Sequence, residues 1–435
     1  MGKERPTRKK SKQENYKYVE QKPHSIFNIA VIVGALGYFV DIYDLLLFSI
    51  IRVPSLKSMG LDEPSIAREG LRILNIQMLG LLLGGVIWGV LGDKKGRMKV
   101  LFASIILYSV GNIANGFVNT VPQYALVRFI TGLGLAGELG AGITLVSELM
   151  PKERRGIATS MVAGIGLSGA VFAYFIRQQF VGPDGGGWRT CYFIGGALGF
   201  LLLFLRVGVL ESGMFQHIAQ SSSVKKGNIL MLFTNGKRLK KYLTSILIAL
   251  PNWYVIGILL SFSDKFSSKM NVQGTVDPGK AIMVAYAAVS VGDVLIGFIS
   301  QWMKSRKKAL LLFNIITVIS AIWYFNLDGQ SANTVYVVAA LLGFGTGFWA
   351  MFVTMAAEQF GTNIRATVAT TAPNMARGSL NLVSILFVNL QSHLDPAHAY
   401  VKSGWITGIV VFSISFISLA LTEETFGKDL NYLEV

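Results

Sequence analysis

Cysteine and histidine are scarce in this chain, and their positions exclude several kinds of site chemistry. Cys191 is the only cysteine among 435 residues, so no disulfide can form within the chain and no cysteine cluster can hold a metal. The four histidines fall in the N-terminal tail or in predicted loops, with no pair at helical spacing: His24, His217, His393 and His398. Because a Ser/His/Asp set is also lacking, the sequence indicates neither an enzyme nor a metal or other cofactor.

Charged residues are also few. They make up 15% of the chain, whereas 52% of the residues are hydrophobic. Such a chain cannot hide its apolar surface in a water-soluble core, so it needs lipid as its solvent. Apolar runs of roughly 20 residues can each cross a hydrocarbon layer of ~30 Å. Twelve such runs predict transmembrane helices near 27–51, 74–92, 99–119, 123–149, 157–180, 190–210, 242–263, 281–303, 308–327, 334–356, 366–390 and 404–422.

Acidic residues are in the minority, with 24 Asp and Glu against 40 Lys and Arg, for a net charge of +16. The basic residues alternate with the predicted helices and do not line one face, so we expect no nucleic-acid partner. If twelve helices alternate, every basic cluster lies on the same side of the membrane. The positive-inside rule then places both termini in the cytoplasm. The basic clusters lie in residues 1–25, 94–99, 152–155, 225–241 and 304–308.

This arrangement predicts an all-α integral membrane protein with two pseudo-symmetric six-helix bundles. We expect the bundles at 26–210 and 242–422, joined by a cytoplasmic loop at 211–241. The basic tail at 1–25 lacks a short apolar segment with a cleavage site, so we interpret it as a cytoplasmic extension and not as a signal peptide. Residues 423–435 form the second cytoplasmic tail.

One charged motif occurs in both predicted halves, each time where an apolar run ends. Glu148 and Arg155 bracket the first copy, and Glu358 and Arg365 bracket the second with the same spacing. A repeated six-helix unit of this kind is typical of a transporter with a substrate path between its halves.

A second motif follows the second apolar run, where the chain turns between Gly89 and Arg97. Asp93 in this turn can accept hydrogen bonds from the N-terminus of a facing helix. The glycines of residues 132–137 lie inside a predicted helix, so we interpret them as a close-packing face and not as a phosphate-binding loop.

These motifs resemble those of the major facilitator superfamily, especially its metabolite-symporter, organic-anion, phosphate-symporter and sugar-porter branches. The resemblance covers nearly the whole chain. It implies two bundles that rock about a central site. It also implies a cytoplasmic gate whose ion pairs break on opening, built from Gly89, Asp93, Arg97, Glu148, Arg155, Glu358 and Arg365.

Ionisable residues within the apolar runs are the candidates for coupling and binding, because each costs roughly 2.5–3.5 kcal/mol to insert at a helix centre. Asp44 and Arg128 fall at similar depth, and sugar porters pair acid and arginine at matching positions. We therefore expect their pair to break when Asp44 is protonated. Asp41 and Glu138 are further proton-coupling candidates, although they could instead form a buried structural pair that shares a proton.

Arg377 is the candidate that best indicates the substrate. Phosphate symporters carry Gly-Lys at the matching position, whereas an arginine there resembles the organic-anion symporters, and its planar fork suits a carboxylate. Asn374 and Asn381 share its helix face. Asp293 in the eighth run serves either structure or substrate. The seventh run, with Asn252, lacks the sugar-porter pattern.

Aromatic residues are further candidates for the cavity wall. These are Tyr43, Trp253 and Trp349, although tryptophans near helix ends also serve as interface anchors. Together these features predict proton-coupled uptake of a small organic anion by alternating access, in a monomer within the plasma membrane, such as a bacterial inner membrane. The alternatives are an inorganic phosphate:proton symporter, an exporter of a drug or siderophore, and a non-transporting nutrient sensor.

Overall fold

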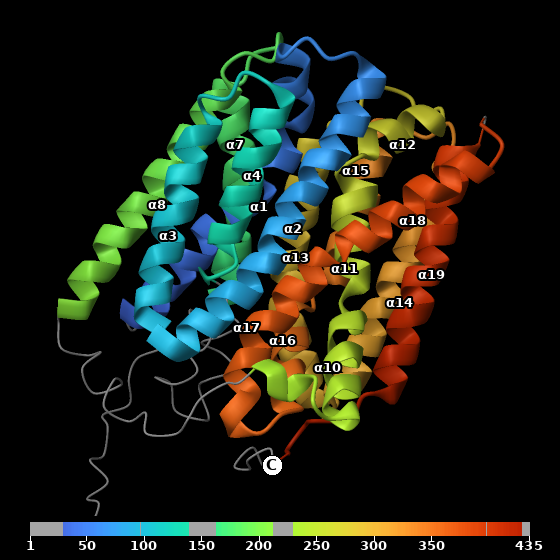
Figure 1. Ribbon diagram of the computed structural model, residues 1–435. Coiled ribbons are helices and arrows are strands. Elements are labelled where there is room, and N and C mark those ends of the chain that lie inside the picture. The colour runs from blue at the N-terminus through green and yellow to red at the C-terminus, as the bar shows by residue number, and fades with distance from the viewer. Residues whose placement is uncertain (1–28, 96, 139–161, 212–228, 397, 429–435) are drawn as a thin grey trace, which may run out of the picture.

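The computed structural model describes residues 29–95, 97–138, 162–211, 229–396 and 398–428, and these residues are almost entirely helical (Figure 1). The N-terminal half contains α1 (Ile29–Ser58), α2 (Glu63–Lys95), α3 (Arg97–Asn115), α4 (Val121–Leu135), α7 (Gly169–Phe180) and α8 (Trp188–Glu211). The predicted all-α membrane fold is confirmed. Glu148 and Arg155, two residues of the expected gate, lie outside the described residues.

The C-terminal half runs from residue 229 to residue 421. Its elements are η1 (Ile229–Leu232), α10 (Gly236–Ile248), α11 (Leu250–Tyr254), η2 (Val255–Leu260), α12 (Ser263–Lys269), α13 (Pro278–Trp302), α14 (Arg306–Tyr324), α15 (Ala332–Thr346), α16 (Trp349–Glu358), α17 (Thr362–Gly378), α18 (Leu380–His393) and α19 (Ala399–Leu421).

Three predicted spans are built from consecutive short helices. The seventh comprises α10, α11 and the π-helix η2, the tenth is α15 followed by α16, and the eleventh is α17 followed by α18. Proline at position 251 has no backbone N–H, which helps to explain the break between α10 and α11. Irregular backbone of this kind is tolerated at membrane depth where it is buried in protein or lines a cavity.

Several helix boundaries differ from the predicted apolar runs. The first helix continues to Ser58 and the second begins at Glu63, so the predicted loop between them shrinks to a short turn. α10 begins at Gly236, inside the segment expected as the central loop, because the Asn235 side chain caps it by accepting from Lys237 N. Hydropathy alone misses these extensions because polar residues can continue a helix beyond the apolar layer.

Glycines bring helices into backbone contact within each half. A Cβ added at Gly132 of α4 would strike the carbonyl oxygen of Gln77 in α2, and one at Gly343 of α15 would strike Ala285 in α13. The glycine-rich segment of α4 therefore serves close packing, as the sequence predicts. The two halves meet where α2 lies along α17 and where α1 and α7 lie against α13.

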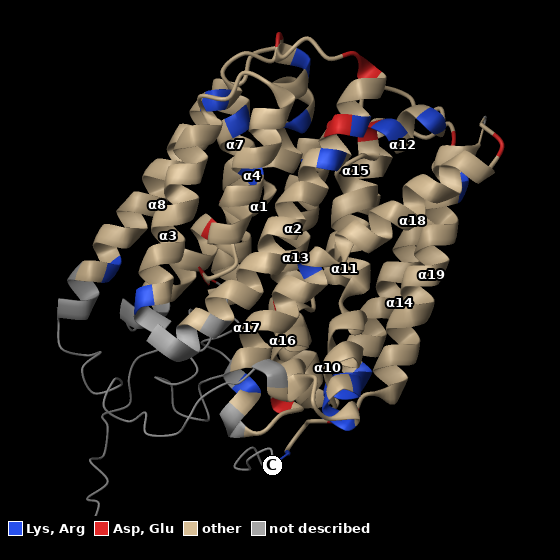
Figure 2. Ribbon diagram, in the orientation of Figure 1, with Lys and Arg blue, Asp and Glu red and all other residues tan. Residues whose placement is uncertain are grey.

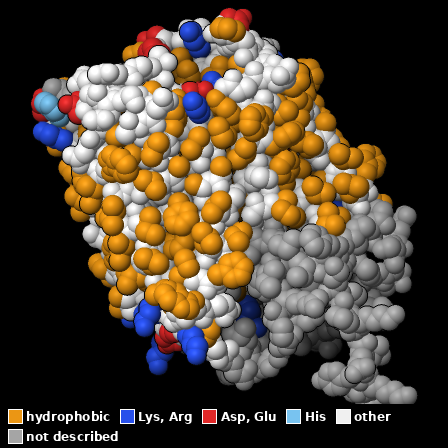
Figure 3. Space-filling model, turned by 180° about the vertical axis from the view of Figure 1, so that it is seen from behind, with side chains coloured by type: hydrophobic (Ala, Val, Ile, Leu, Met, Phe, Trp, Pro, Cys, Tyr) orange, Lys and Arg blue, Asp and Glu red, His pale blue; other side chains and the backbone are white. Residues whose placement is uncertain are grey.

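The outer surface matches a protein that is solvated by lipid. Figure 3 shows hydrophobic side chains over the middle of the visible face, with the coloured charged side chains gathered towards its two ends. Figure 2 shows the same distribution along the ribbons, with only a few charged residues in the middle of the bundle. Eight helical segments of the described residues are long and apolar enough to cross a membrane.

Candidate functional site

Arg377 and Asp41 meet at the interface between the two halves. Arg377 lies at the end of α17, and its Nη2 is 3.5 Å from Oδ2 of Asp41 in α1; both side chains are buried. Arg377 Nη1 also donates to Asn374 Oδ1 at 3.5 Å, while Asn374 Nδ2 donates across the interface to Ala136 O at 2.9 Å. The structure therefore brings three predicted site residues together at mid-depth.

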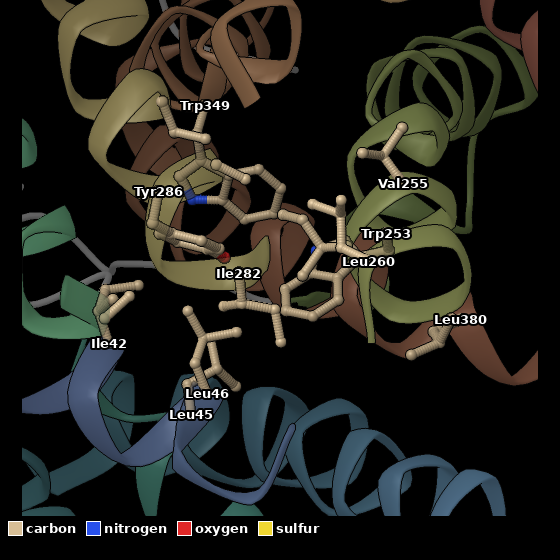
Figure 4. Packing of buried hydrophobic residues seen from close by; sticks show 14 of the residues in the cluster. Ile42, Leu45, Leu46, Trp253, Val255, Leu260, Ile282, Tyr286, Trp349 and Leu380 are labelled. Carbon is tan, nitrogen blue, oxygen red and sulfur yellow. The ribbon is translucent and has the colours of Figure 1, made fainter. Parts of the chain in front are cut away.

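Aromatic rings surround this charged centre. The guanidinium carbon of Arg377 lies 5.7 Å from the ring centroid of Trp349, and the Trp253 ring packs edge-on against Trp349 at 6.4 Å. Figure 4 shows both tryptophans and Tyr286 on the C-terminal side of the interface, with aliphatic residues of α1 opposite them. Trp253 and Trp349 thus lie in the central core and not at the membrane surface.

Most of the unpaired polar atoms around this centre are donors, while Oδ1 of Asp41 is an acceptor that is also buried without a partner among the described residues. Nε1 of Trp253, Nε1 of Trp349 and Nε of Arg377 are all buried and have no hydrogen-bond partner among the described residues. An unsatisfied buried donor costs about 1–3 kcal/mol. A ligand that brings acceptor oxygens, such as a carboxylate, would relieve this cost.

Asp293 contacts the site indirectly, through the backbone of the helix that carries Trp349. Its carboxylate accepts from the backbone N–H of Ala350 at 3.0 Å and 3.3 Å, at the first turn of α16. Since α16 begins at Trp349, Asp293 fixes the start of the helix that carries this ring. Asp293 therefore has a structural contact in the described residues, in line with one of its two predicted roles.

Asp44 and Arg128 are neighbours, but they are not paired through the carboxylate. Arg128 Nη2 donates to the main-chain oxygen of Asp44 at 3.0 Å, and its Nε donates to Gln77 Oε1 at 3.2 Å. Both carboxylate oxygens of Asp44 are buried without a hydrogen-bond partner among the described residues. The expected carboxylate–guanidinium pair is not formed in this structure: Gln77 Oε1 and the Asp44 main-chain oxygen accept from Nε and Nη2, while Nη1 has no partner among the described residues. The coupling role of Asp44 and Arg128 stays a prediction.

Glu138 has a partner that sequence reasoning missed. Arg206 of α8 forms a bidentate ion pair with it, with Nη1 3.0 Å from Oε2 and Nη2 bonded to Oε1. The alternative pairing of Glu138 with Asp41 is not formed. Arg206 lies inside the sixth predicted apolar run. An arginine there is costly to insert, and this cost could have marked it as a candidate site residue.

The other polar candidates make local contacts. Asn252 Nδ2 donates to Thr346 O at 2.9 Å and fastens α11 to the end of α15. Asn381 Nδ2 donates to Gly378 O at 3.1 Å, across the break between α17 and α18. Tyr43 donates to Cys191 O at 2.7 Å, so its hydroxyl lies within the N-terminal half.

The predicted gate is only partly described. Gly89 of α2 faces Thr371 of α17, where an added Cβ would lie 3.5 Å from Thr371 Cγ2. Glu358 is 3.6 Å from Arg306 Nη2 and accepts from Thr425 at 2.6 Å, whereas Arg365 Nε donates to Phe360 O. The side chains of Asp93 and Arg97 lie outside the described part.

Ion pairs at the opposite end of the molecule join the two halves. Buried Arg52 of α1 holds Asp264 of α12 at 2.8 Å and also donates to Ser261 O at 3.0 Å. Two further pairs cross the same interface, Lys265 with Glu63 at 2.5 Å and Arg177 with Asp277. Sequence could not pair these residues, because their partners depend on how two separate bundles align.

Two helical halves with a buried charged site between them define a membrane transporter. The sequence profile of the Major Facilitator Superfamily matches residues 34–384, and the chain belongs to this family. The family and its relatives are transporters and not enzymes.

Named relatives share most of the chain's length. It is 26% identical to the niacin transporter NiaP of Acinetobacter baylyi over 95% of this chain and 98% of that one. It is 27% identical to a putative metabolite transport protein of Haemophilus influenzae, covering 80% of this chain and 85% of that one. The crystal structure of a D-xylose–proton symporter superposes with a TM-score of 0.67 at 18% identity, covering 93% of this chain and 100% of that one.

Proposed function

We propose that this protein is a proton-coupled symporter that takes up a small organic anion by alternating access. The observation that carries the proposal is the set of unpaired buried donors around Arg377 at the interface of the two halves. A substrate carboxylate that binds there would take the place of Asp41 as the partner of Arg377. Because the substrate carboxylate and the Asp41 carboxylate then compete for one guanidinium, binding would be linked to protonation of the neighbouring acids Asp41 and Asp44.

The aromatic wall supports a planar, ring-bearing acid as the substrate. Trp349, Trp253 and Tyr286 offer ring faces and edges beside Arg377, which suit offset or edge-to-face contact with a flat ring. A pyridine carboxylate such as niacin, named for the Acinetobacter relative, combines such a ring with one carboxylate. Phosphate is the second candidate, since a guanidinium fork also binds phosphate, although it would leave the aromatic wall without a ligand contact.

The charge distribution supports an orientation in which both termini face the cytoplasm, as we expect for a protein of a bacterial inner membrane. The described basic residues at the start of α10 and of α14 gather at one end of the bundle (Figure 2): Lys237, Arg238, Lys240, Lys241, Arg306, Lys307 and Lys308. The opposite end carries paired charges of both signs. By the positive-inside rule, the basic end faces the cytoplasm.

A direct test is proton entry into proteoliposomes that contain the purified protein and a trapped pH dye. Ring-bearing monocarboxylates, aliphatic mono-, di- and tricarboxylates, and phosphate would be added in separate pools, with Asp44→Asn liposomes as the control. A signal from a carboxylate pool that vanishes in the variant is the expected result. A signal with phosphate alone would favour the second candidate, and silence from every pool would contradict both.

A further inference from the structure

A second polar region lies inside the N-terminal half, away from the interface between the halves. It comprises Asp44 of α1, Asn112, Ser109 and Tyr108 of α3, and the Nη1 atom of Arg128 in α4, and we call it the polar seam. All five side chains are fully buried. Both Asp44 oxygens, both Asn112 side-chain atoms, the two hydroxyls and Arg128 Nη1 have no hydrogen-bond partner among the described residues.

So many unpaired groups in one place need an explanation. Each costs about 1–3 kcal/mol if it stays unsatisfied, whereas a typical buried polar group in a native protein has a partner. The set contains hydrogen-bond acceptors, donors, and two hydroxyls that can both donate and accept. Water molecules can satisfy all three kinds of group. Apolar side chains would have filled this region at lower cost, so the polar groups indicate a task and not packing.

Two glycines of α8 face the polar seam, so the side chains of the seam pack directly against the α8 backbone. A Cβ added at Gly195 would lie 2.5 Å from Asp44 Oδ1 and 3.5 Å from Asn112 Nδ2. One added at Gly199, one turn further along, would overlap the Ser109 hydroxyl and lie 2.9 Å from the Tyr108 ring. The same helix face therefore accommodates first the carboxylate and then the two hydroxyls.

The seam continues towards the end of the bundle where α8 ends. Arg206 lies on α8 beyond Gly199 and holds Glu138, and a Cβ added at Gly37 of α1 would overlap both partners. Tyr108 lies against Gly134 of α4, one turn before Glu138, because a Cβ added at Gly134 would lie 2.6 Å from Tyr108 N. From Gly195 to Arg206 the helix rises about 16 Å, roughly half of a hydrocarbon layer of ~30 Å.

We propose that the polar seam is a proton path through the N-terminal half, separate from the substrate path between the halves. A proton leaves the Asp44 carboxyl, passes along Asn112-bound water and the hydroxyls of Ser109 and Tyr108, and is released to water at the cytoplasmic end of the bundle, beside Glu138 and Arg206. Asp44 is left as a carboxylate, and each hydroxyl regains the proton that it hands on. This path rests on the proposed proton coupling, and it gives the coupled proton its own exit.

The position of Asp41 links the path to the substrate site. Asp41 and Asp44 are three residues apart on one face of α1, and Asp41 faces Arg377. A substrate carboxylate that draws Arg377 away leaves Asp41 without its cation. The uncompensated negative charge then favours a proton on the neighbouring Asp44, and the seam is the route by which Asp44 later releases that proton.

The double variant Tyr108→Phe/Ser109→Ala tests the path, because it removes both hydroxyls and nearly preserves volume. The matched control is Tyr324→Phe/Ser320→Ala on α14 of the C-terminal half, where both side chains are buried and their hydroxyls donate to Leu259 O and Ile316 O. Substrate exchange between equal concentrations and accumulation driven by a pH gradient would be measured on the full chain in proteoliposomes.

The seam variant is expected to exchange substrate like the wild type, while its proton-driven accumulation falls at least about tenfold, as for loss of a proton-transfer group. The control variant is expected to keep both activities. A seam variant that still accumulates substrate, or that loses exchange and accumulation equally, would overturn the path. A wild type without substrate-dependent proton entry would instead overturn the proposed coupling, and the path with it.

Radiolytic hydroxyl labelling in liposomes tests for water without any transport assay. Water in the seam should label the Tyr108 ring, whereas the equally buried Tyr324, whose hydroxyl is satisfied by a carbonyl, should stay unlabelled. If Tyr108 is no more labelled than Tyr324, the seam holds no water and the proposed path is wrong.

Discussion

Arg377 and Asp41 form a fully buried ion pair that joins the two halves of the transporter, with Nη2 and Oδ2 3.5 Å apart. Removing one partner of a buried pair typically costs about 3–5 kcal/mol, because the other charge is left uncompensated. The pair therefore links the halves, and under the proposed function a bound ligand would supply the replacement charge. We therefore expect substrate recognition to depend on Arg377 more than on any other side chain of the site.

Replacing Arg377 with alanine should abolish binding of the carboxylate substrate, because the guanidinium supplies both the charge and the planar fork. Arg377→Lys should keep some recognition of phosphate-like anions, since an ammonium remains a point charge without the fork. Equilibrium binding of radiolabelled acid to detergent-purified protein measures both. Arg189→Ala is the control, because Arg189 is bonded to Val118 O away from the site. Unchanged uptake in Arg377→Ala would remove the argument for an anion.

Asp44→Asn should separate exchange from accumulation. The amide keeps the size of the side chain but cannot be ionised, so the variant should exchange substrate across liposomes and fail to concentrate it against a gradient. The measurement is substrate uptake with and without an imposed pH difference. An Asp44→Asn transporter that still accumulates substrate would rule out the coupling role.

Asp293 should behave differently from Asp44 under the same substitution. Its carboxylate accepts from Ala350 N, and the oxygen of an asparagine can still accept that bond. Asp293→Asn should therefore keep accumulation, while Asp293→Ala should lose the cap, destabilise the protein by about 1 kcal/mol and weaken substrate binding through Trp349. Thermal unfolding and binding would be measured for both variants. Loss of accumulation in Asp293→Asn would instead assign Asp293 to proton coupling.

The sequence predicted the spans and many buried polar residues, because apolar runs and the cost of insertion are local properties. It could place Asp41 and Arg377 at depth, whereas it left Trp349 as either a cavity residue or an interface anchor, and the structure adds that the three lie together. It could not predict that Arg206 pairs with Glu138, since that depends on how α8 packs against the segment that follows α4. The same limit applies to Asp264, whose partner Arg52 lies in the other half.

The Glu138–Arg206 pair should show strong non-additivity. Glu138→Gln or Arg206→Met alone leaves a buried charge without its partner and should cost about 3–5 kcal/mol. The double variant removes both charges and should regain most of that loss, because Gln and Met are close in volume to the Glu and Arg side chains that they replace. A thermal-unfolding cycle over the four proteins measures the coupling. Additive losses would mean that the pair contributes little to the stability of the N-terminal half.

The Arg52–Asp264 pair should keep the two halves in contact at its own end of the molecule. Arg52 is buried and reaches Asp264 and Ser261 O in the opposite half, contacts that require the two halves to be close at this end. Hydrogen bonds to charged groups contribute about 1.5–3 kcal/mol, so Asp264→Ala should raise the population open to this side by roughly tenfold or more.

Labelling from this side of the membrane can report that opening. In a Cys191→Ser background, a cysteine introduced at buried Ile282 between the halves would be treated with an impermeant maleimide. Its labelling should accelerate in Asp264→Ala and not in Glu69→Ala, because among the described residues Glu69 pairs with the exposed Arg68 and Arg72 of its own helix. Equal labelling rates in both variants would show that the Arg52–Asp264 pair does not control opening, and that closure at this end depends on the remaining inter-half packing.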